Sequence, residues 1–174
     1  MMEFVLQCDT CERCKHESVA RPGLLQPLGV PDQDWANITM DFVEGLPRLE
    51  GKNYVLVVVD RLTKYNHFLS LSHPFTTQEV ARLFLDNVVK LHGVPQTIIS
   101  DRDKVFTCLF WQELLKSLGS KLHMFIAYHP ETNGQSERVN QCLETYLKCF
   151  YFMQPKGWHK WLSLTQWWYN FSHH

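Results

Sequence analysis

The 174-residue chain lacks an excess of either charge, because 17 Lys and Arg residues nearly balance 18 Asp and Glu residues. Its overall charge therefore predicts no nucleic-acid partner, and binding to phosphates would need a local basic surface. We expect no membrane partner, since the longest aliphatic run, Val55–Val59, is far too short to span a bilayer. The first residues also lack the pattern of a secretory signal, so the six cysteines are expected to be reduced thiols in an intracellular protein.

Hydrophobic residues make up 45% of the chain, which is enough for one domain with a real core. Three prolines and two glycines between Pro22 and Pro31 favour an extended linker. The expected organisation is a separate segment over residues 1–21, a linker over 22–34, and a folded domain over 35–174.

Hydrophobic periodicity predicts strands around residues 38–42, 53–60, 65–71, 97–100 and 122–126. A capping box, Thr76–Glu79, opens a helix that ends at Gly93, and a second helix covers 110–118. A long helix begins at Glu137. A last helix carries aromatic and aliphatic residues: Trp158, Trp161, Leu164, Trp168 and Phe171. Three antiparallel strands followed by helix-linked parallel strands predict an α/β fold with a ribonuclease H-like, mixed five-stranded sheet flanked by helices.

Three acids, Asp41, Asp101 and Glu137, have an unusual spacing, with 35 residues (102–136) between the last two. Asp41 lies on the first predicted strand, Asp101 ends the fourth, and Glu137 falls in the first turn of a helix. Carboxylates are the ligands that Mg²⁺ prefers, and two such ions can assist both sides of a phosphodiester displacement. We expect Asp41 to bridge two ions, either Mg²⁺ or Mn²⁺, with Asp101 and Glu137 each completing one. Other acids are interpreted as turn formers, helix caps or solvated residues: Asp60, Asp86, Asp103 and Glu144.

The phrases around these acids resemble retroviral-type integrases, and especially integrases of Gypsy-type long-terminal-repeat retrotransposons of plants. Residues 35–47, 57–65, 91–111 and, most specifically, Tyr128–Asn140 carry the resemblance, which runs from about residue 8 to 170. It implies that the three acids form a catalytic triad for polynucleotidyl transfer. In that reaction water trims the 3′ ends of the element, and the exposed 3′-hydroxyls then attack target DNA.

The resemblance also implies DNA as partner, a homo-oligomer when active, and a nuclear location. The loop over residues 127–135 is expected to engage the DNA end. Candidate DNA-binding residues are Arg61, Lys64, Tyr128, Asn133, Gln135, Ser136 and Arg138. The alternative for the loop is that Asn133 and Gly134 only form a helix entry, and exposed basic residues often do no more than solvate a surface.

Cys8 and Cys11 resemble the second half of the His-His-Cys-Cys zinc module of this family. A zinc site needs four well-placed donors, and Cys14 and His16 lie at tight spacings. We therefore expect residues 1–21 to be a remnant of that module without bound Zn²⁺, and the family's C-terminal DNA-binding barrel to be absent.

Two alternatives to an active integrase core stay open. The first is a truncated, catalytically inactive integrase-derived protein that binds nucleic acid or another partner, which the near-neutral charge favours. The second is a ribonuclease H-type endonuclease, which is disfavoured because that group usually carries an additional catalytic acid.

Overall fold

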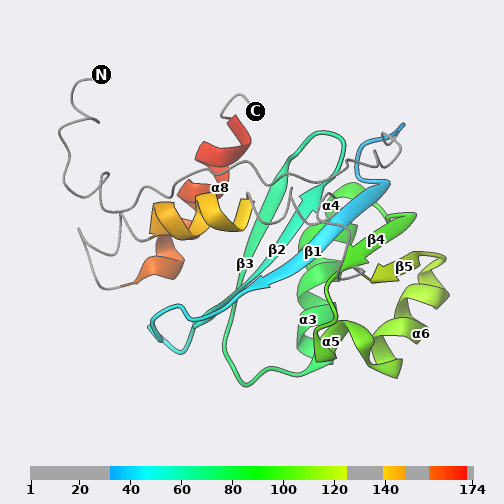
Figure 1. Ribbon diagram of the computed structural model, residues 1–174, viewed down its shortest axis with the longest axis horizontal. Coiled ribbons are helices and arrows are strands. Elements are labelled where there is room, and N and C mark those ends of the chain that lie inside the picture. The colour runs from blue at the N-terminus through cyan, green and yellow to red at the C-terminus, as the bar shows by residue number, and fades with distance from the viewer. Residues whose placement is uncertain (1–31, 125–138, 148–156, 172–174) are drawn as a thin grey trace, which may run out of the picture.

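The computed structural model describes residues 32–124, 139–147 and 157–171 of the chain. Five strands form one mixed sheet in the order β3-β2-β1-β4-β5 (Figure 1). β1 pairs antiparallel with β2 and β2 with β3, whereas β1 with β4 and β4 with β5 are parallel. This confirms the predicted sheet, with boundaries close to the expected ones. The strands are β1 (Asn37–Val43), β2 (Tyr54–Asp60), β3 (Asn66–Leu71), β4 (Thr97–Ser100) and β5 (Lys121–Met124).

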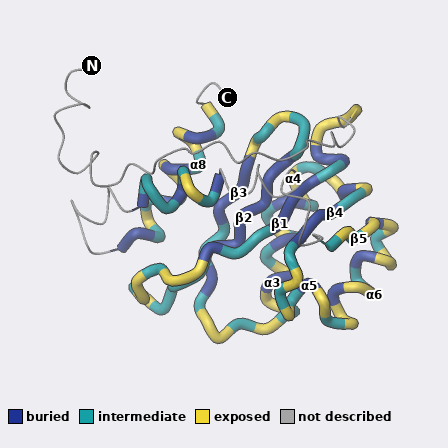
Figure 2. Tube along the Cα trace, viewed as in Figure 1, coloured by how far each residue is buried: buried dark blue, intermediate teal, exposed yellow. Residues whose placement is uncertain are grey.

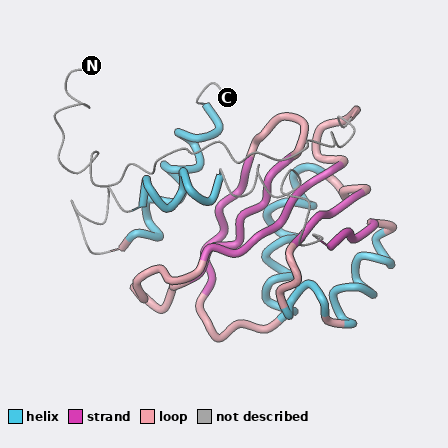
Figure 3. Tube along the Cα trace, in the orientation of Figure 1, coloured by secondary structure: helices cyan, strands magenta, loops and turns pink. Residues whose placement is uncertain are grey.

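Helices cover both faces of the sheet (Figures 1 and 3). One face packs against α3 (Thr77–Phe84), η1 (Leu85–Val89), α4 (Lys90–His92), α5 (Lys104–Thr107) and α6 (Leu109–Leu118). The other face packs against the helical residues 139–147, the 3₁₀ turn η2 (Trp158–Trp161) and α8 (Leu162–Phe171). Among the described residues, no helix has both the length and the apolar character needed to cross a membrane.

The central strands supply side chains to two separate cores because successive residues of a strand point to opposite faces. In β2, Leu56 and Val58 join the core under α3 and α6, whereas Val55, Val57 and Val59 join the core under residues 139–147 and α8. All five are at most 1% exposed. The dark strands in Figure 2 show the resulting buried layer. This two-sided burial explains the uninterrupted apolar run of β2.

The helix predicted after Thr76 forms with its capping box, in which Thr76 and Glu79 satisfy each other's backbone N–H groups. It is not a uniform α-helix, however. The middle segment η1 is π-helical, and the backbone N–H of Lys90 donates to the carbonyl of Leu85. Gly93 then ends the helix with a positive φ of 84°, as the sequence predicted.

The last helix packs along β3, which is an edge strand. The amide of Asn170 accepts a hydrogen bond from the backbone N–H of Asn66 (2.9 Å) and donates one to its carbonyl (3.0 Å). Gln166, one turn earlier, accepts from the backbone N–H of Phe68 (2.9 Å). These two side chains satisfy strand groups that would otherwise lack partners, so α8 closes this edge of the sheet.

Most aromatic residues of the last helix lie on its exposed side, with Tyr169 as the exception. Trp158 is buried, but Leu164, Trp168 and Phe171 are exposed. The contacts with the core come instead from Leu162, Thr165 and Tyr169. Aromatic content therefore marked the helix correctly but did not identify the buried face.

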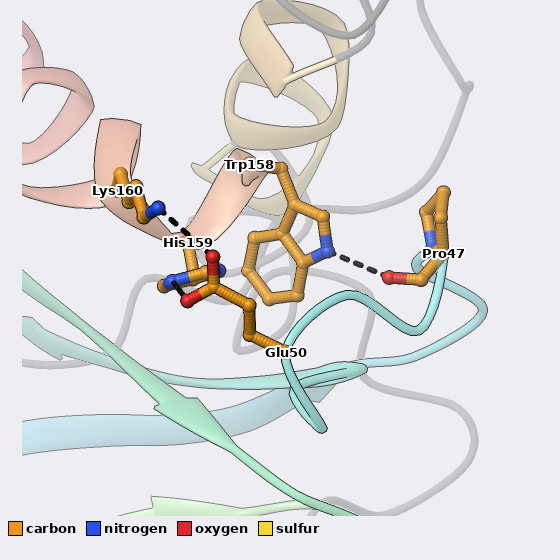
Figure 4. Close-up of polar contacts among 5 residues, drawn as sticks. All are labelled: Pro47, Glu50, Trp158, His159 and Lys160. Atoms are coloured by element: carbon orange, nitrogen blue, oxygen red, sulfur yellow. Dashed lines mark hydrogen bonds and ion pairs between the residues drawn. The ribbon is translucent and has the colours of Figure 1, made fainter. Parts of the chain in front are cut away.

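The loop between β1 and β2 is fastened to η2 (Figure 4). The indole Nε1–H of Trp158 donates to the carbonyl of Pro47 at 2.7 Å. The carboxylate of Glu50 lies 3.1 Å from Nε2 of His159 and 2.8 Å from Nζ of Lys160. The loop that follows the strand bearing Asp41 is thus held by the C-terminal part of the chain.

Candidate active site

Asp41 lies within β1, and Asp101 directly follows the neighbouring parallel strand β4. The register pairs Met40 of β1 with Ser100 of β4, so the next residues along both strands are Asp41 and Asp101. Neighbouring strands are about 4.8 Å apart, and residues in register point to the same face. The two acids predicted to share a metal site thus follow the last register pair of β1 and β4 on neighbouring strands.

The side chain of Asp41 is held at both oxygens. Its Oδ1 accepts a hydrogen bond from the backbone N–H of Phe42, and its Oδ2 accepts one from Nδ2 of Asn140, both at 2.8 Å. Asn140 lies at the start of the helical residues 139–147, whose Val139 and Leu143 are buried against the sheet. The hydrogen bond from Asn140 fixes this helix next to Asp41.

Asn140 is a site residue to which the sequence analysis gave no role. Its amide oxygen Oδ1 is buried and has no hydrogen-bond partner in the described part of the structure. A buried amide oxygen without a partner is unfavourable unless a donor or cation meets it. The signal was available in the sequence, because Asn140 follows Glu137 by three residues and such residues share one face of a helix.

The surroundings of Asp101 disfavour the ionised form of its carboxyl group. Burial raises the pKa of the Asp101 carboxyl above its ordinary value, and the carboxylates of Asp103 and Glu44 raise it further. The backbone N–H of Asp103, 3.1 Å from Oδ1 of Asp101, acts in the opposite direction. A cation bound here would relieve the crowding of negative charge. Asp103 itself caps α5 by accepting from the N–H of Val105 (2.7 Å), which confirms its interpretation as a helix cap.

Other predicted site residues lie outside the described residues. These are Cys8, Cys11, Tyr128, Asn133, Gln135, Ser136, Glu137 and Arg138. Within the described ranges, no group of three or more His, Cys, Asp or Glu side chains is arranged to hold a metal ion. The structure places Asp41 and Asp101 at neighbouring strand positions, while a shared metal site and the position of Glu137 stay predictions.

A family model described as "Integrase core domain" matches residues 33–130, more than half of the chain. The chain belongs to the integrase core domain family. The matched range contains Asp41 and Asp101, whereas Glu137 lies beyond it. Over all 174 residues, this integrase core is 33% identical to the "Transposon Tf2-3 polyprotein" and the "Transposon Tf2-4 polyprotein" of Schizosaccharomyces pombe. It spans 13% of the length of these curated relatives.

Solved integrase structures share the fold of this integrase core. One is a simian T-cell lymphotropic virus intasome in complex with PP2A regulatory subunit B56 gamma. It has a TM-score of 0.68 and 19% identity over 95% of this chain and 58% of that chain. Another is the HTLV-2 integrase catalytic core domain in complex with magnesium, in dimeric form. Its TM-score is 0.61, with 18% identity over 77% of this chain and 85% of that chain.

Arg61 and Lys64, two candidate DNA-binding residues of the integrase core, lie in the turn after β2, at the opposite end of β1 from Asp41. The backbone N–H of Arg61 donates to the carbonyl of Asn37 at the start of β1, four residues or about 13 Å from Asp41 along the strand. The reason is that β2 runs antiparallel to β1, so the turn after β2 lies beside the start of β1 and not beside Asp41. The ammonium of Lys64 also bends back to the carbonyl of Arg61 (2.6 Å).

Burial lowers the pKa of both the Arg61 and the Lys64 side chains. The turn that contains them is built on Asp60, which is fully buried. Asp60 accepts hydrogen bonds from the backbone N–H groups of Trp35 and Thr63 and from the Thr63 hydroxyl. Asp60 is thus the turn former that the sequence indicated, and a role of Arg61 or Lys64 in DNA binding stays a prediction for a separate surface.

Glu144 is not the solvated helix residue that the sequence predicted. It is partly buried and lines a cavity of about 250 Å³. The cavity lies between the β1–β2 loop, the helical residues 139–147 and Trp158, and Glu44 forms another part of its wall. A helix-face argument could not detect this, because the loop that covers Glu144 belongs to a distant part of the sequence.

Proposed function

We propose that the chain is the catalytic core of a retrotransposon integrase and performs metal-dependent polynucleotidyl transfer on DNA. The supporting observation is that Asp41 in β1 and Asp101 just after β4 directly follow the register pair Met40–Ser100, with Asn140 hydrogen-bonded to Asp41. Membership of the integrase core domain family gives this geometry its chemical meaning. Glu137 is proposed as the third acid.

The donors available at the site fit a hard divalent cation. Asp41 and Asp101 offer carboxylate oxygens, and the amide oxygen of Asn140 is buried without a partner. An all-oxygen set suits Mg²⁺ or Mn²⁺ better than Zn²⁺. We propose that Asp41, Asp101 and Glu137 hold two such ions, with Asp41 shared between them. When bound, these ions activate the attacking oxygen and stabilise the leaving oxygen of a phosphodiester displacement.

The protein contributes position and charge. Asn140 and the N–H of Phe42 each hold one oxygen of Asp41, so the carboxylate keeps a fixed orientation. The pKa of Asp101 is raised by burial and by neighbouring carboxylates, so cation binding and ionisation of this acid support each other. The two displacements are cleavage by water near the 3′ end of the element and attack by the resulting 3′-hydroxyl on target DNA.

A disintegration assay tests this function because it reverses strand transfer on a branched DNA and needs only the core. We expect turnover with Mg²⁺ or Mn²⁺ that is lost in the Asp41→Asn and Glu137→Gln variants. Asp86→Asn is the matched control, because Asp86 is an exposed acid paired with Arg82 on the opposite face of the sheet. Removing one ligand carboxylate should reduce turnover by at least about 100-fold, as loss of a major electrostatic contributor does in other enzymes.

The alternative of an inactive integrase-derived binding protein makes the opposite forecast. If the chain is such a binding protein, its affinity for DNA should fall as the salt concentration rises. The unmodified chain should show no turnover with either Mg²⁺ or Mn²⁺. Activity that is equal in Asp41→Asn and Asp86→Asn would also contradict the proposed site, since catalysis would then not depend on the acid pair.

Finer assignments belong to the same proposal. The phrase Tyr128–Asn140 supports a Gypsy-type, plant-like element as the source. The known assemblies in the names of the structural neighbours, an intasome and a dimeric core, support DNA and a homo-oligomer as partners. A nuclear location, the division into residues 1–21, 22–34 and 35–174, and a zinc-free segment with Cys8 and Cys11 are proposed on the resemblance alone.

A further inference from the structure

Five aromatic side chains form a continuous series of ring contacts from the core to the surface, which we call the aromatic ladder. It consists of Phe106, Phe42, Phe75, Tyr54 and His73. Phe42 stacks on Phe106 (5.1 Å, 15°) and on Phe75 (5.5 Å, 28°). Tyr54 meets Phe75 edge-on at 5.4 Å and stacks on His73 (5.1 Å, 21°). Phe106 is fully buried, whereas His73 is exposed.

The aromatic ladder packs on the sheet face opposite the Asp41 carboxylate, and Tyr54 shares the neighbouring carboxylates of Glu44 and Asp103 with Asp101. Phe42 follows Asp41 in β1 and donates its backbone N–H to that carboxylate. Phe106 belongs to α5, the short helix that begins immediately after Asp101–Asp103. The ring of His73 is at most about 11 Å from that of Phe42, because both contact Phe75, at 5.6 and 5.5 Å.

The imidazole of His73 is held in place although it is exposed. One side of the ring rests on Tyr54, and Phe75 meets it edge-on at 89°. The backbone N–H of His73 donates to the side-chain oxygen of Asn53 at 2.7 Å, which ties its loop to the neighbouring strand end. A fixed, exposed aromatic ring is the feature that single-stranded nucleic-acid sites use to stack bases.

The charges around the aromatic ladder favour a base over a phosphate. Tyr54 continues the β1–β2 register opposite Glu44, one step beyond the Val43–Val55 pair. Burial and the carboxylates of Glu44 and Asp103 raise the pKa of the Tyr54 hydroxyl, so that group stays protonated. Neighbouring carboxylates repel phosphate but not the uncharged face of a base.

We propose that His73, supported by Tyr54, stacks on an unpaired base of the DNA strand whose phosphate lies at Asp41 and Asp101. This inference rests on the proposed function and adds to it a residue that holds the DNA end. His73 acts here by direct contact with the substrate, and the rest of the aromatic ladder keeps its ring oriented.

The test uses DNA duplexes with a short unpaired 3′ end that carries 2-aminopurine, whose fluorescence falls on stacking. The dye is placed in turn at each of the first four nucleotides. We expect quenching at one or two adjacent positions with the unmodified chain and its loss in His73→Ala. Affinity for the unpaired end should fall about 5- to 150-fold, as for a lost base–aromatic stack. Affinity for a dumbbell duplex without ends should not change.

Two further variants separate stacking from other effects. His73→Phe keeps an aromatic face without hydrogen-bonding nitrogens and should restore quenching and affinity. Trp167→Ala removes an exposed ring on α8, across the sheet, and should bind like the unmodified chain.

Wild-type affinity in His73→Ala, or equal losses in His73→Phe and His73→Ala, would overturn the stacking role. If branched DNA is still turned over in that case, the proposed function stands without it. If the unmodified chain neither binds nor turns over DNA, both proposals fail.

Discussion

The amide of Asn170 offers the sharpest test of how the last helix holds the sheet together. In Asn170→Ala, the backbone N–H and carbonyl of Asn66 both lose their side-chain partner. Asn66 is fully buried, so water cannot readily replace the lost bonds. Each buried backbone group left unsatisfied costs about 1–3 kcal/mol. We expect the free energy of unfolding to fall by about 2–6 kcal/mol for the two groups, a large share of the 5–15 kcal/mol typical of a domain.

Urea unfolding at equilibrium measures this change, with the slope of the transition checked for two-state behaviour. Ser163→Ala is the control on the same helix, because Ser163 is exposed, and it should change stability by less than about 0.5 kcal/mol. Hydrogen exchange gives a local readout, since the amides of Asn66 and Phe68 should lose protection together. If Asn170→Ala is no less stable than the control, α8 does not close the edge of β3 and the argument is wrong.

Two further outcomes are expected. The pKa of His67 is lowered to about 4 by burial and by nearby His92, so the folded chain resists protonation that the unfolded chain accepts. Stability should be complete above about pH 6.5 and fall as the pH drops towards 4, by about 2 kcal/mol between pH 7.5 and 5. Denaturation at both pH values should show this loss in the unmodified chain and a smaller one in His67→Gln. Secondly, Asn140→Ala frees one oxygen of Asp41, and disintegration should slow about 10- to 100-fold while unfolding stability changes little. Equal rates would mean that Asn140 does not orient Asp41.

The strands and their order were predictable because each carries its own local signal. The two-sided apolar run of β2, the alternation in β1 and the capping box at Thr76 depend only on neighbouring residues, and all three predictions are confirmed. The placement of Asp41 and Asp101 on neighbouring strands followed from topology, since parallel strands end at the same side of a sheet. The sequence segments that resemble integrases then gave those two acids a chemical interpretation.

Contacts between distant segments were beyond the reach of the sequence. Arg61 and Lys64 were candidate DNA-binding residues, and the antiparallel direction of β2 places their turn beside Asn37, at the opposite end of β1 from Asp41. Glu144 looked solvated on its own helix, but the β1–β2 loop covers it. The buried side of α8 could not be chosen by aromatic content, because backbone groups of β3 select Gln166 and Asn170 for that side.

The sequence by itself determined the element types, the mixed sheet and the pair of acids at its edge, since these depend on local periodicity and strand direction. Only the tertiary structure decided which side chains support that edge. Asn140 reaches Asp41 across 99 positions of the chain, and the aromatic ladder joins residues from β1, β2, the loop before α3, and α5. Such partners are selected by packing in three dimensions, where separation along the chain no longer sets the distance between side chains.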